Sequence, residues 1–130
     1  MDDVKKNSLL IVDDDTLNLM ELTHIFQPFY RIYVAKDGVS AIKIAQRSLP
    51  DLILLDIVMP DKNGFEVINE LKSFETTKDI PVIFITGIVD KDSENAGLTA
   101  GAVDYIHKPF DASNVRARVH RHINKVIKVE

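Results

Sequence analysis

The feature of this sequence that most constrains its fold is a series of short apolar runs with almost no polar interruption. They occupy residues 9–12, 32–35, 52–55 and 82–85, with a weaker run at 105–106. Continuous apolar runs of this length are typical of strands that are covered on both faces, as in a parallel sheet. The sequence therefore predicts five strands in a sheet with helices on both sides.

Helical periodicity fills the intervals between these runs. The apolar faces of the expected helices are Leu19, Leu22 and Phe26; Ala41, Ile44 and Ala45; Phe65, Ile68 and Leu71 after Gly64; and Val115, Val119, Ile123 and Val126 after a Ser113 cap. A short polar helix is expected over 93–99. Strand and helix then alternate five times, which predicts an α/β fold of three layers around one open parallel sheet, with right-handed crossovers.

Length and composition suit one soluble domain over residues 1–130. The chain is 45% hydrophobic, and it has no cysteine for a disulfide or a thiolate metal site. Its first residues lack the apolar segment of a signal peptide, and no apolar run approaches the ~20 residues that span a bilayer. With a net charge of −4, nucleic acid is not expected as the main partner. We expect a cytoplasmic protein without membrane contact.

Charged and polar side chains follow four of the five expected strands. Asp13 and Asp14 come after the first strand, Asp56 after the third, Thr86 after the fourth and Lys108 after the fifth. Ligands of an open α/β sheet gather at the carboxyl ends of its strands, so these side chains are expected to meet at one edge. Nothing comparable follows the second strand, which predicts that this strand lies at the margin of the sheet, away from the site.

Crowded carboxylates repel one another, and a divalent cation is a natural compensation. Mg²⁺ prefers oxygen ligands, whereas zinc is disfavoured because there is no cysteine and because His120 and His122, two positions apart, point to different faces of a helix. An ammonium and a hydroxyl beside Mg²⁺ suit a phosphoryl group. The simpler alternative is that an aspartate after a strand caps the next helix, and Asp15 or Thr16 is the expected cap of the first one.

Several motifs together are similar to one known family. They are LIVDDD at 10–15, LLDIVMP at 54–60, DKNG at 61–64, FITG at 84–87, GA at 101–102 and KPF at 108–110. In order and spacing the sequence resembles a response-regulator receiver domain of two-component signalling, over about residues 8–125. The resemblance implies a flavodoxin-like (βα)5 fold with strand order 2-1-3-4-5.

The resemblance also implies a set of site residues. Asp56 would accept a phosphoryl group from the phosphohistidine of a sensor histidine kinase or phosphotransfer protein. Asp14 would bind Mg²⁺ directly and Asp13 mainly through water, and Asp56 and the backbone carbonyl of Val58 would complete the metal site. The chain would thus be a phosphoacceptor switch that assists its own phosphorylation and dephosphorylation, rather than an enzyme.

The implied switch involves residues beyond the acceptor. Thr86 and Lys108 would contact the phosphoryl oxygens, and the Lys108–Pro109 bond would be cis. When Thr86 moves toward the phosphoryl group, Tyr105 would turn inward. The altered surface would be the fourth helix, fifth strand and fifth helix, which would bind a downstream effector or a second copy of the chain.

Some positions and the chain end leave alternatives open. Val58 and Ile88 are apolar beside the expected path of the attacking water, so we hypothesise that they slow dephosphorylation. His107 is interpreted as a core or edge histidine, with a tuning role as the alternative. The last helix, expected over 114–130, is long and basic, and it suits a linker or a dimer contact. The chain is then either a stand-alone receiver or the receiver of a larger regulator.

Other classes of protein fit the residues less well. Haloacid-dehalogenase-type phosphatases also use an aspartyl nucleophile with Mg²⁺, but Leu17 stands where their D-x-D-x-T/V motif needs Thr or Val, and Asp104 is alone where they have an acidic pair. A degenerate receiver that only binds proteins usually lacks part of the acidic site, which is complete here. A nucleotide or flavin domain would have a glycine-rich loop after the first strand.

Overall fold

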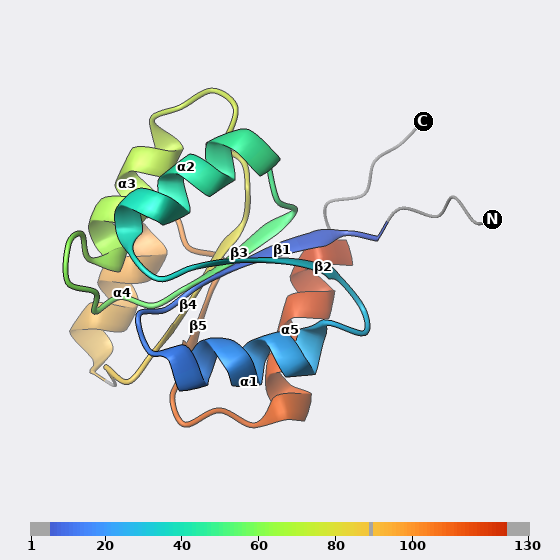
Figure 1. Cartoon of the computed structure of the whole chain (residues 1–130). Coiled ribbons are helices and arrows are strands. Elements are labelled where there is room, and N and C mark those ends of the chain that lie inside the picture. The colour runs from blue at the N-terminus through green and yellow to red at the C-terminus, as the bar shows by residue number, and fades with distance from the viewer. Residues whose placement is uncertain (1–5, 89, 125–130) are drawn as a thin grey trace.

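Within residues 6–88 and 90–124, which are the residues that the structure describes, five parallel strands form one sheet and five helices cover it (Figure 1). The structure is a computed structural model. The strands are β1 (Ser8–Val12), β2 (Arg31–Ala35), β3 (Leu52–Leu55), β4 (Val82–Thr86) and β5 (Asp104–His107). The helices are α1 (Thr16–Phe26), α2 (Gly38–Ser48), α3 (Gly64–Lys72), α4 (Lys91–Thr99) and α5 (Ala112–Asn124).

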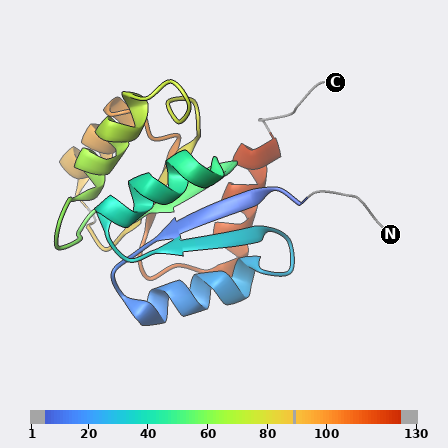
Figure 2. The same cartoon turned by 45° about the horizontal axis from the view of Figure 1, so that its top comes forward.

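The strand order in the sheet is β2-β1-β3-β4-β5, which confirms the order that the resemblance implies. Every neighbouring pair is parallel, and β1 lies between β2 and β3 and pairs with both, so β3 is the central strand. Figure 2 shows β2 as an outer strand beside β1. The prediction that the second strand lies at the margin is therefore confirmed.

The sheet separates two apolar cores, which explains why the strand runs have no polar alternation. On one face, Leu10, Val12 and Phe84 pack with residues of α2 and α3. On the other face, Leu9 and Ile11 pack with residues of α1 and α5. Figure 1 shows the same division, with α2, α3 and α4 on one side of the sheet and α1 and α5 on the other. Because side chains alternate across a strand, a sheet covered on both faces needs apolar residues at every position.

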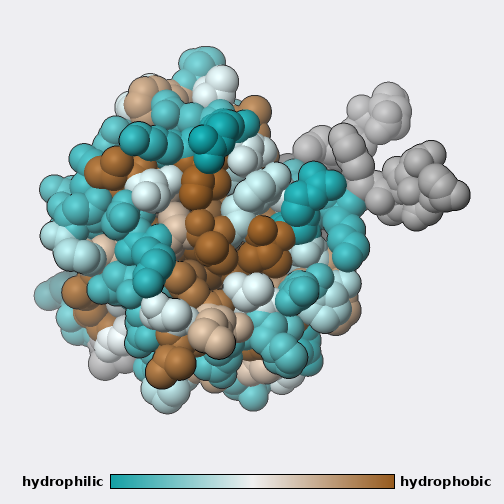
Figure 3. All heavy atoms as spheres, viewed as in Figure 1, coloured by the Kyte–Doolittle hydropathy of each residue, from teal (hydrophilic) through white to brown (hydrophobic). Residues whose placement is uncertain are grey.

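The edge strand β2 departs from this pattern. Its residues are mostly half-buried or exposed, whereas every residue of β1 is buried. Val34 keeps 45% of its surface exposed. Figure 3 is viewed as Figure 1 and shows hydrophobic residues gathered in the middle of this face, which β2 crosses. An edge strand has one neighbour instead of two, so helices cover it less completely.

Polar side chains begin the helices. Capping carboxylates accept hydrogen bonds from the first turns of α1, α2 and α4: Asp15, Asp37 and Asp90. Asn63 and Glu66 form a reciprocal capping box at the start of α3. Asp15 is thus the cap of the first helix, one of the two residues that the sequence offers.

The predicted Ser113 cap of the last helix is wrong. Helix α5 begins at Ala112, and Asp111 accepts hydrogen bonds from the Asn114 backbone at 3.1 Å and from the Ser113 hydroxyl at 2.7 Å. A carboxylate one position before the helix can accept both bonds, whereas Ser113 already lies in the first turn.

The apolar faces of the helices agree with the sequence in most positions. Val115, Val119 and Ile123 are buried, while Val126 and the expected extension of α5 lie outside the described residues. In α2, Ile42 is buried and Ile44 is only partly buried. Among the described residues, no helix is long and apolar enough to cross a membrane.

Gly64 provides a test of the close packing between α3 and β3. A Cβ atom at Gly64 would lie 2.7 Å from the Asp56 carbonyl oxygen and 2.8 Å from the Ile57 Cα, both backbone atoms that cannot rotate away. We expect Gly64→Ala to lower the free energy of unfolding by about 1–3 kcal/mol, measured by urea denaturation. The control is Gly87→Ala, since a Cβ there meets nothing within 4 Å. Equal stability of the two variants would contradict this account.

Candidate functional site

The polar residues at the strand ends are held in place by continuations of the sheet. The backbone N–H of Asp13 donates to Ala35 at 3.1 Å, and that of Asp56 donates to Val12 at 3.0 Å. The Lys108 N–H donates to the Thr86 carbonyl at 2.8 Å. Each residue therefore keeps the geometry of the sheet one step past its strand, and its side chain is directed by a rigid element.

Lys108 joins two of the predicted carboxylates directly. Its Nζ lies 2.8 Å from Asp13 Oδ2 and 3.1 Å from Asp56 Oδ2. Asp13 is fully buried and Asp56 is 5% exposed, so both carboxylates depend on protein groups to replace water. The Lys108–Pro109 peptide bond is cis, as predicted.

Further hydrogen bonds orient the oxygens of the two buried carboxylates. Asp13 Oδ1 accepts from the Asp15 N–H at 2.9 Å, and its Oδ2 also accepts from the Asn18 side chain at 3.3 Å. Asp56 Oδ1 accepts from the Ile57 N–H at 2.7 Å. Asn18 is a site residue that the sequence prediction missed. The sequence feature that could have indicated it is the position of Asn18 in the first turn of the helix that begins just after Asp13.

Three carboxylates of the site are close enough to hold one metal ion. An oxygen from each of Asp13, Asp14 and Asp56 lies within 4.8 Å of the others. Two of these residues are buried, while Asp14 is exposed and leaves a route from solvent. An all-oxygen donor set with an open side fits Mg²⁺, which keeps several waters or phosphate oxygens as ligands. The Val58 side chain is 60% exposed and apolar. Only its backbone carbonyl could therefore be a metal ligand.

The electrostatics of the site make the charged form of Asp56 costly. Burial raises the pKa of Asp56, the nearby Asp13 charge raises it too, and Lys108 and the Thr86 hydroxyl lower it, with burial the largest effect. For Lys108, burial lowers the pKa, but the hydrogen bond to Asp13 and the two carboxylate charges raise it overall. The site therefore holds a firmly charged ammonium and carboxylates that gain from additional positive charge.

Thr86 is connected to Tyr105 through one residue. The Thr86 Oγ1 accepts a hydrogen bond from the Ile88 N–H at 3.4 Å, and the Tyr105 hydroxyl donates to the Ile88 carbonyl at 3.0 Å. Tyr105 is 4% exposed and its ring lies against Phe84, so it is turned inward in this structure. A displacement of Thr86 toward Asp56 would therefore disturb the hydrogen bond of Tyr105.

His107 is not a core residue, so the core half of that interpretation is wrong and the edge half is correct. Its side chain is 42% exposed on the edge strand β5, with its Nε2 3.7 Å from Glu94 of α4 and its ring against Tyr105. Alternation along β5 places Tyr105 and His107 on the same face, and the strand end leaves His107 uncovered.

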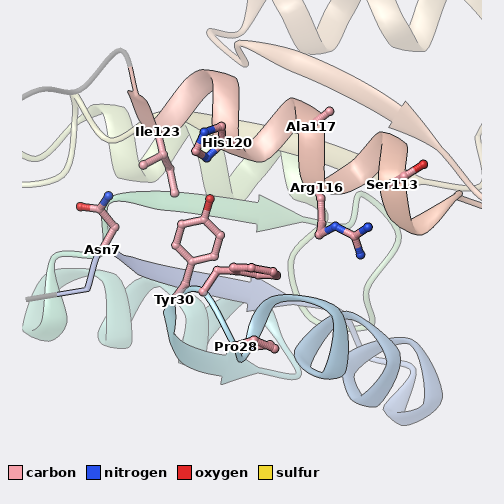
Figure 4. Close-up of a pocket in the computed structure, with 9 residues that line it drawn as sticks. Asn7, Pro28, Tyr30, Ser113, Arg116, Ala117, His120 and Ile123 are labelled. Carbon is pink, nitrogen blue, oxygen red and sulfur yellow. The ribbon is translucent and has the colours of Figure 1, made fainter.

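Two hollows lie near α5, at different distances from the carboxylates. A small one of about 320 Å³ is beside Lys108 and is lined by Asn18, Glu21, Lys108, Pro109 and Phe110. A groove of about 760 Å³ lies between α5 and the α1–β2 loop, where Figure 4 shows His120 and Tyr30 on facing elements. His122 bonds Asp104 instead, so the two histidines do point to different faces.

Comparison with known proteins places this geometry in a family. Residues 9–120 match the response regulator receiver domain. The chain belongs to this family. Receiver domains are phosphoacceptor switches of phosphorelay signalling, and the five-stranded flavodoxin-like order seen here is that of CheY-like receivers. The phosphatase and the nucleotide- or flavin-binding alternatives are thereby set aside.

Individual relatives agree with this assignment. A Vibrio cholerae protein named "Probable cyclic di-GMP phosphodiesterase" is 42% identical over 123 residues, which cover 95% of this chain and 28% of that protein. The structure of chemotaxis protein CheY4 of Vibrio cholerae has a TM-score of 0.85 and 26% identity, covering 89% of this chain and 98% of that one. The receiver domain of sensor histidine kinase PA1611 from Pseudomonas aeruginosa PAO1 has a TM-score of 0.85 and 27% identity, covering 92% and 98%, and its crystal structure has a magnesium ion in the active site cleft.

This receiver chain spans about a quarter of the length of the first curated relatives, 28% and 25% for two of them. The activity in the phosphodiesterase's name is that of a much longer protein.

The raised pKa of Asp56 predicts how the free energy of unfolding depends on pH when a chelator keeps the site free of metal ions. Because the folded state binds this proton more tightly than the unfolded state, the contribution of Asp56 to stability falls as pH rises above the ordinary carboxyl value of 3.8. We expect Asp56→Asn to raise the free energy of unfolding at pH 7 by on the order of 1 kcal/mol, since it removes the ionisation cost. Urea denaturation in EDTA should show this gain shrinking toward pH 4. A gain of the same size at both pH values would show that it does not come from the ionisation of Asp56. The control is Asp15→Asn, which changes an exposed aspartate that caps α1.

Proposed function

We propose that Asp56 is the phosphorylated residue of this receiver domain and takes its phosphoryl group from a phosphohistidine of a sensor histidine kinase or phosphotransfer protein. The observation that carries the proposal is the convergence of four strand ends on one acidic cluster, with Lys108 between Asp13 and Asp56. Asp13 is buried beside the same ammonium, but Asp56 follows the central strand β3, so Asp13 and Asp14 after β1 and the Thr86 hydroxyl after β4 flank it on both sides.

The geometry of Asp56 distinguishes its two oxygens. Oδ1 accepts the Ile57 N–H at 2.7 Å, while Oδ2 faces Lys108 at 3.1 Å. Oδ2 is the attacking oxygen: it forms the new O–P bond while the P–N bond of the phosphohistidine breaks and its electron pair returns to the imidazole. Lys108 then shifts from Oδ2 to a phosphoryl oxygen, where its charge compensates the added negative charge.

Asp13, Asp14, Asp56 and the Val58 carbonyl would hold Mg²⁺, which supplies further positive charge to the phosphoryl oxygens. The residues of the chain do the rest: the hydrogen bonds of Asp13 to Asn18 and Lys108 keep its carboxylate in place, and the sheet fixes Asp56. Hydrolysis of the acyl phosphate then resets the receiver.

The same site supports a switch through Thr86. Its hydroxyl is a hydrogen-bonding neighbour of Asp56, and on phosphorylation it would move to donate to a phosphoryl oxygen, which would stretch the bond that it accepts from the Ile88 N–H. Because Ile88 also accepts from Tyr105, the loop that follows β4 would move with Thr86. The surface of α4, β5 and α5 would change, and a downstream effector or a second receiver would bind there.

Several broader predictions remain proposals. They are that residues 1–130 act as one cytoplasmic receiver domain, that they contact neither nucleic acid nor membrane, and that the receiver's only chemistry is its own phosphorylation and dephosphorylation. The continuation of the last helix into a linker or dimer contact lies outside the described residues.

Phosphorylation by a small donor tests the proposal directly. We expect the wild type, incubated with acetyl phosphate and Mg²⁺, to gain the mass of one phosphoryl group, and Asp56→Asn to gain none, measured by intact-protein mass spectrometry. EDTA should prevent the gain in the wild type. Asp15→Asn is the matched control, since this neighbouring aspartate is exposed, caps α1 and should leave the reaction unchanged. Modification of Asp56→Asn to the wild-type extent would overturn the assignment.

The lifetime of the phosphorylated state tests the shielding by Val58 and Ile88. Val58 is largely exposed beside Asp56, and Ile88 packs at the edge of the core. We expect Val58→Gln combined with Ile88→Gln to shorten the half-life severalfold, because amide groups can hydrogen-bond the attacking water. The half-life is measured by the loss of the phosphoryl mass after the donor is removed. An unchanged half-life would count against shielding.

A further inference from the structure

Asp61 lies in the loop between β3 and α3, but its side chain binds the N-terminus of α2. Its Oδ1 accepts the Gly38 N–H and its Oδ2 accepts the Val39 N–H, each at 3.0 Å. These are the first two N–H groups of α2, and Asp37 binds the next one, of Ser40, at 2.8 Å. Two carboxylates thus share the N-terminus of one helix, and only Asp37 belongs to that helix's own cap.

The contact between this loop and α2 is too close for any larger residue at Gly38. A Cβ atom there would lie 2.7 Å from the Lys62 Cβ and 3.0 Å from Val67 Cγ2. At the base of the loop, the Gly64 N–H donates to the Ile57 carbonyl at 2.7 Å. The loop is therefore closed at its base and attached to α2 at its tip.

The bond to α2 is a strong one for an exposed side chain. Hydrogen bonds from Gly38 and Val39 lower the pKa of Asp61 to about 2, so the carboxylate is ionised at any physiological pH. A charged acceptor at a helix N-terminus also gains from the helix dipole. An asparagine could replace only one of the two bonds, because its amide NH₂ would face a backbone N–H.

We propose that Asp61 is a positioning residue for the metal site: by fixing the tip of the β3–α3 loop to α2, it holds the Val58 carbonyl at the acidic cluster. The inference rests on the proposed function, in which this carbonyl is a Mg²⁺ ligand. Val58 lies between Asp56, which the sheet fixes, and Asp61, which α2 fixes. Its exposed side chain supplies little packing of its own.

The residues on either side of Val58 are buried, and this limits what the attachment of Asp61 to α2 can contribute. Ile57 and Met59 are buried in the core, so the loop stays folded without Asp61. After Met59 come two exposed residues, Pro60 and Asp61, so the attachment of Asp61 to α2 is what limits the rotation of the backbone on that side of Val58. Groups that orient a metal ligand typically contribute about 10–100-fold to metal affinity.

The test compares Asp61→Ala with Asp37→Ala in the full chain. Both variants remove one carboxylate and one cap of α2, but only the first releases the loop. We expect Asp61→Ala to weaken Mg²⁺ binding about tenfold, Asp61→Asn to have a smaller effect, and Asp37→Ala to leave the dissociation constant unchanged within about twofold. Binding is measured by isothermal titration calorimetry, and urea denaturation establishes that each variant is folded at the temperature used.

Gly38→Ala provides a second route to the same displacement. The added methyl group pushes Lys62 and the loop away while both carboxylates remain, so Mg²⁺ binding should weaken without any change of charge. Unchanged binding in both Asp61→Ala and Gly38→Ala would overturn the inference, and so would an equal loss in Asp37→Ala. Failure of the wild type to bind Mg²⁺ at all would instead reject the proposed function.

Discussion

A single ammonium group makes it possible to bury the acidic edge of this sheet. Lys108 Nζ lies between Asp13 and Asp56, and without it two carboxylates would be buried near each other with no counter-charge. The pairing satisfies them only in part, because burial still raises the pKa of Asp56. The site is therefore stable enough to fold, yet its carboxylates still gain from additional positive charge, which the proposed Mg²⁺ would supply.

Much of the fold could be predicted because burial on both faces leaves a clear pattern in the sequence. The apolar runs correspond to the strands, and the lack of a candidate site residue after β2 indicates its marginal position. What failed was local. Ser113 was chosen as a cap because it precedes an apolar stripe, but Asp111 is a stronger acceptor and lies at the true start of α5. Periodicity alone does not rank the burial of Ile42 and Ile44, since the orientation of α2 about its own axis decides which of them faces the sheet.

The site could be predicted as a set of strand ends, but not the contacts between elements that support it. Asp13, Asp56 and Lys108 came together because parallel strands share one carboxyl edge. Asn18 and Asp61 were missed in their roles, since each acts across a gap between two elements whose separation the sequence does not record. The exposure of His107 likewise depends on how far α4 covers the end of β5.

Lys108 and Asp13 are far apart in the sequence, and their pairing therefore depends on complete folding of the chain. The two residues are 95 positions apart, and they meet only when the first and last strands occupy the same sheet. An incompletely folded chain would lack this ammonium at the site, and with it the charge balance on which the proposed phosphoryl transfer depends. Under the proposed function such a chain would not be phosphorylated, because the site needs strands from both ends of the sequence.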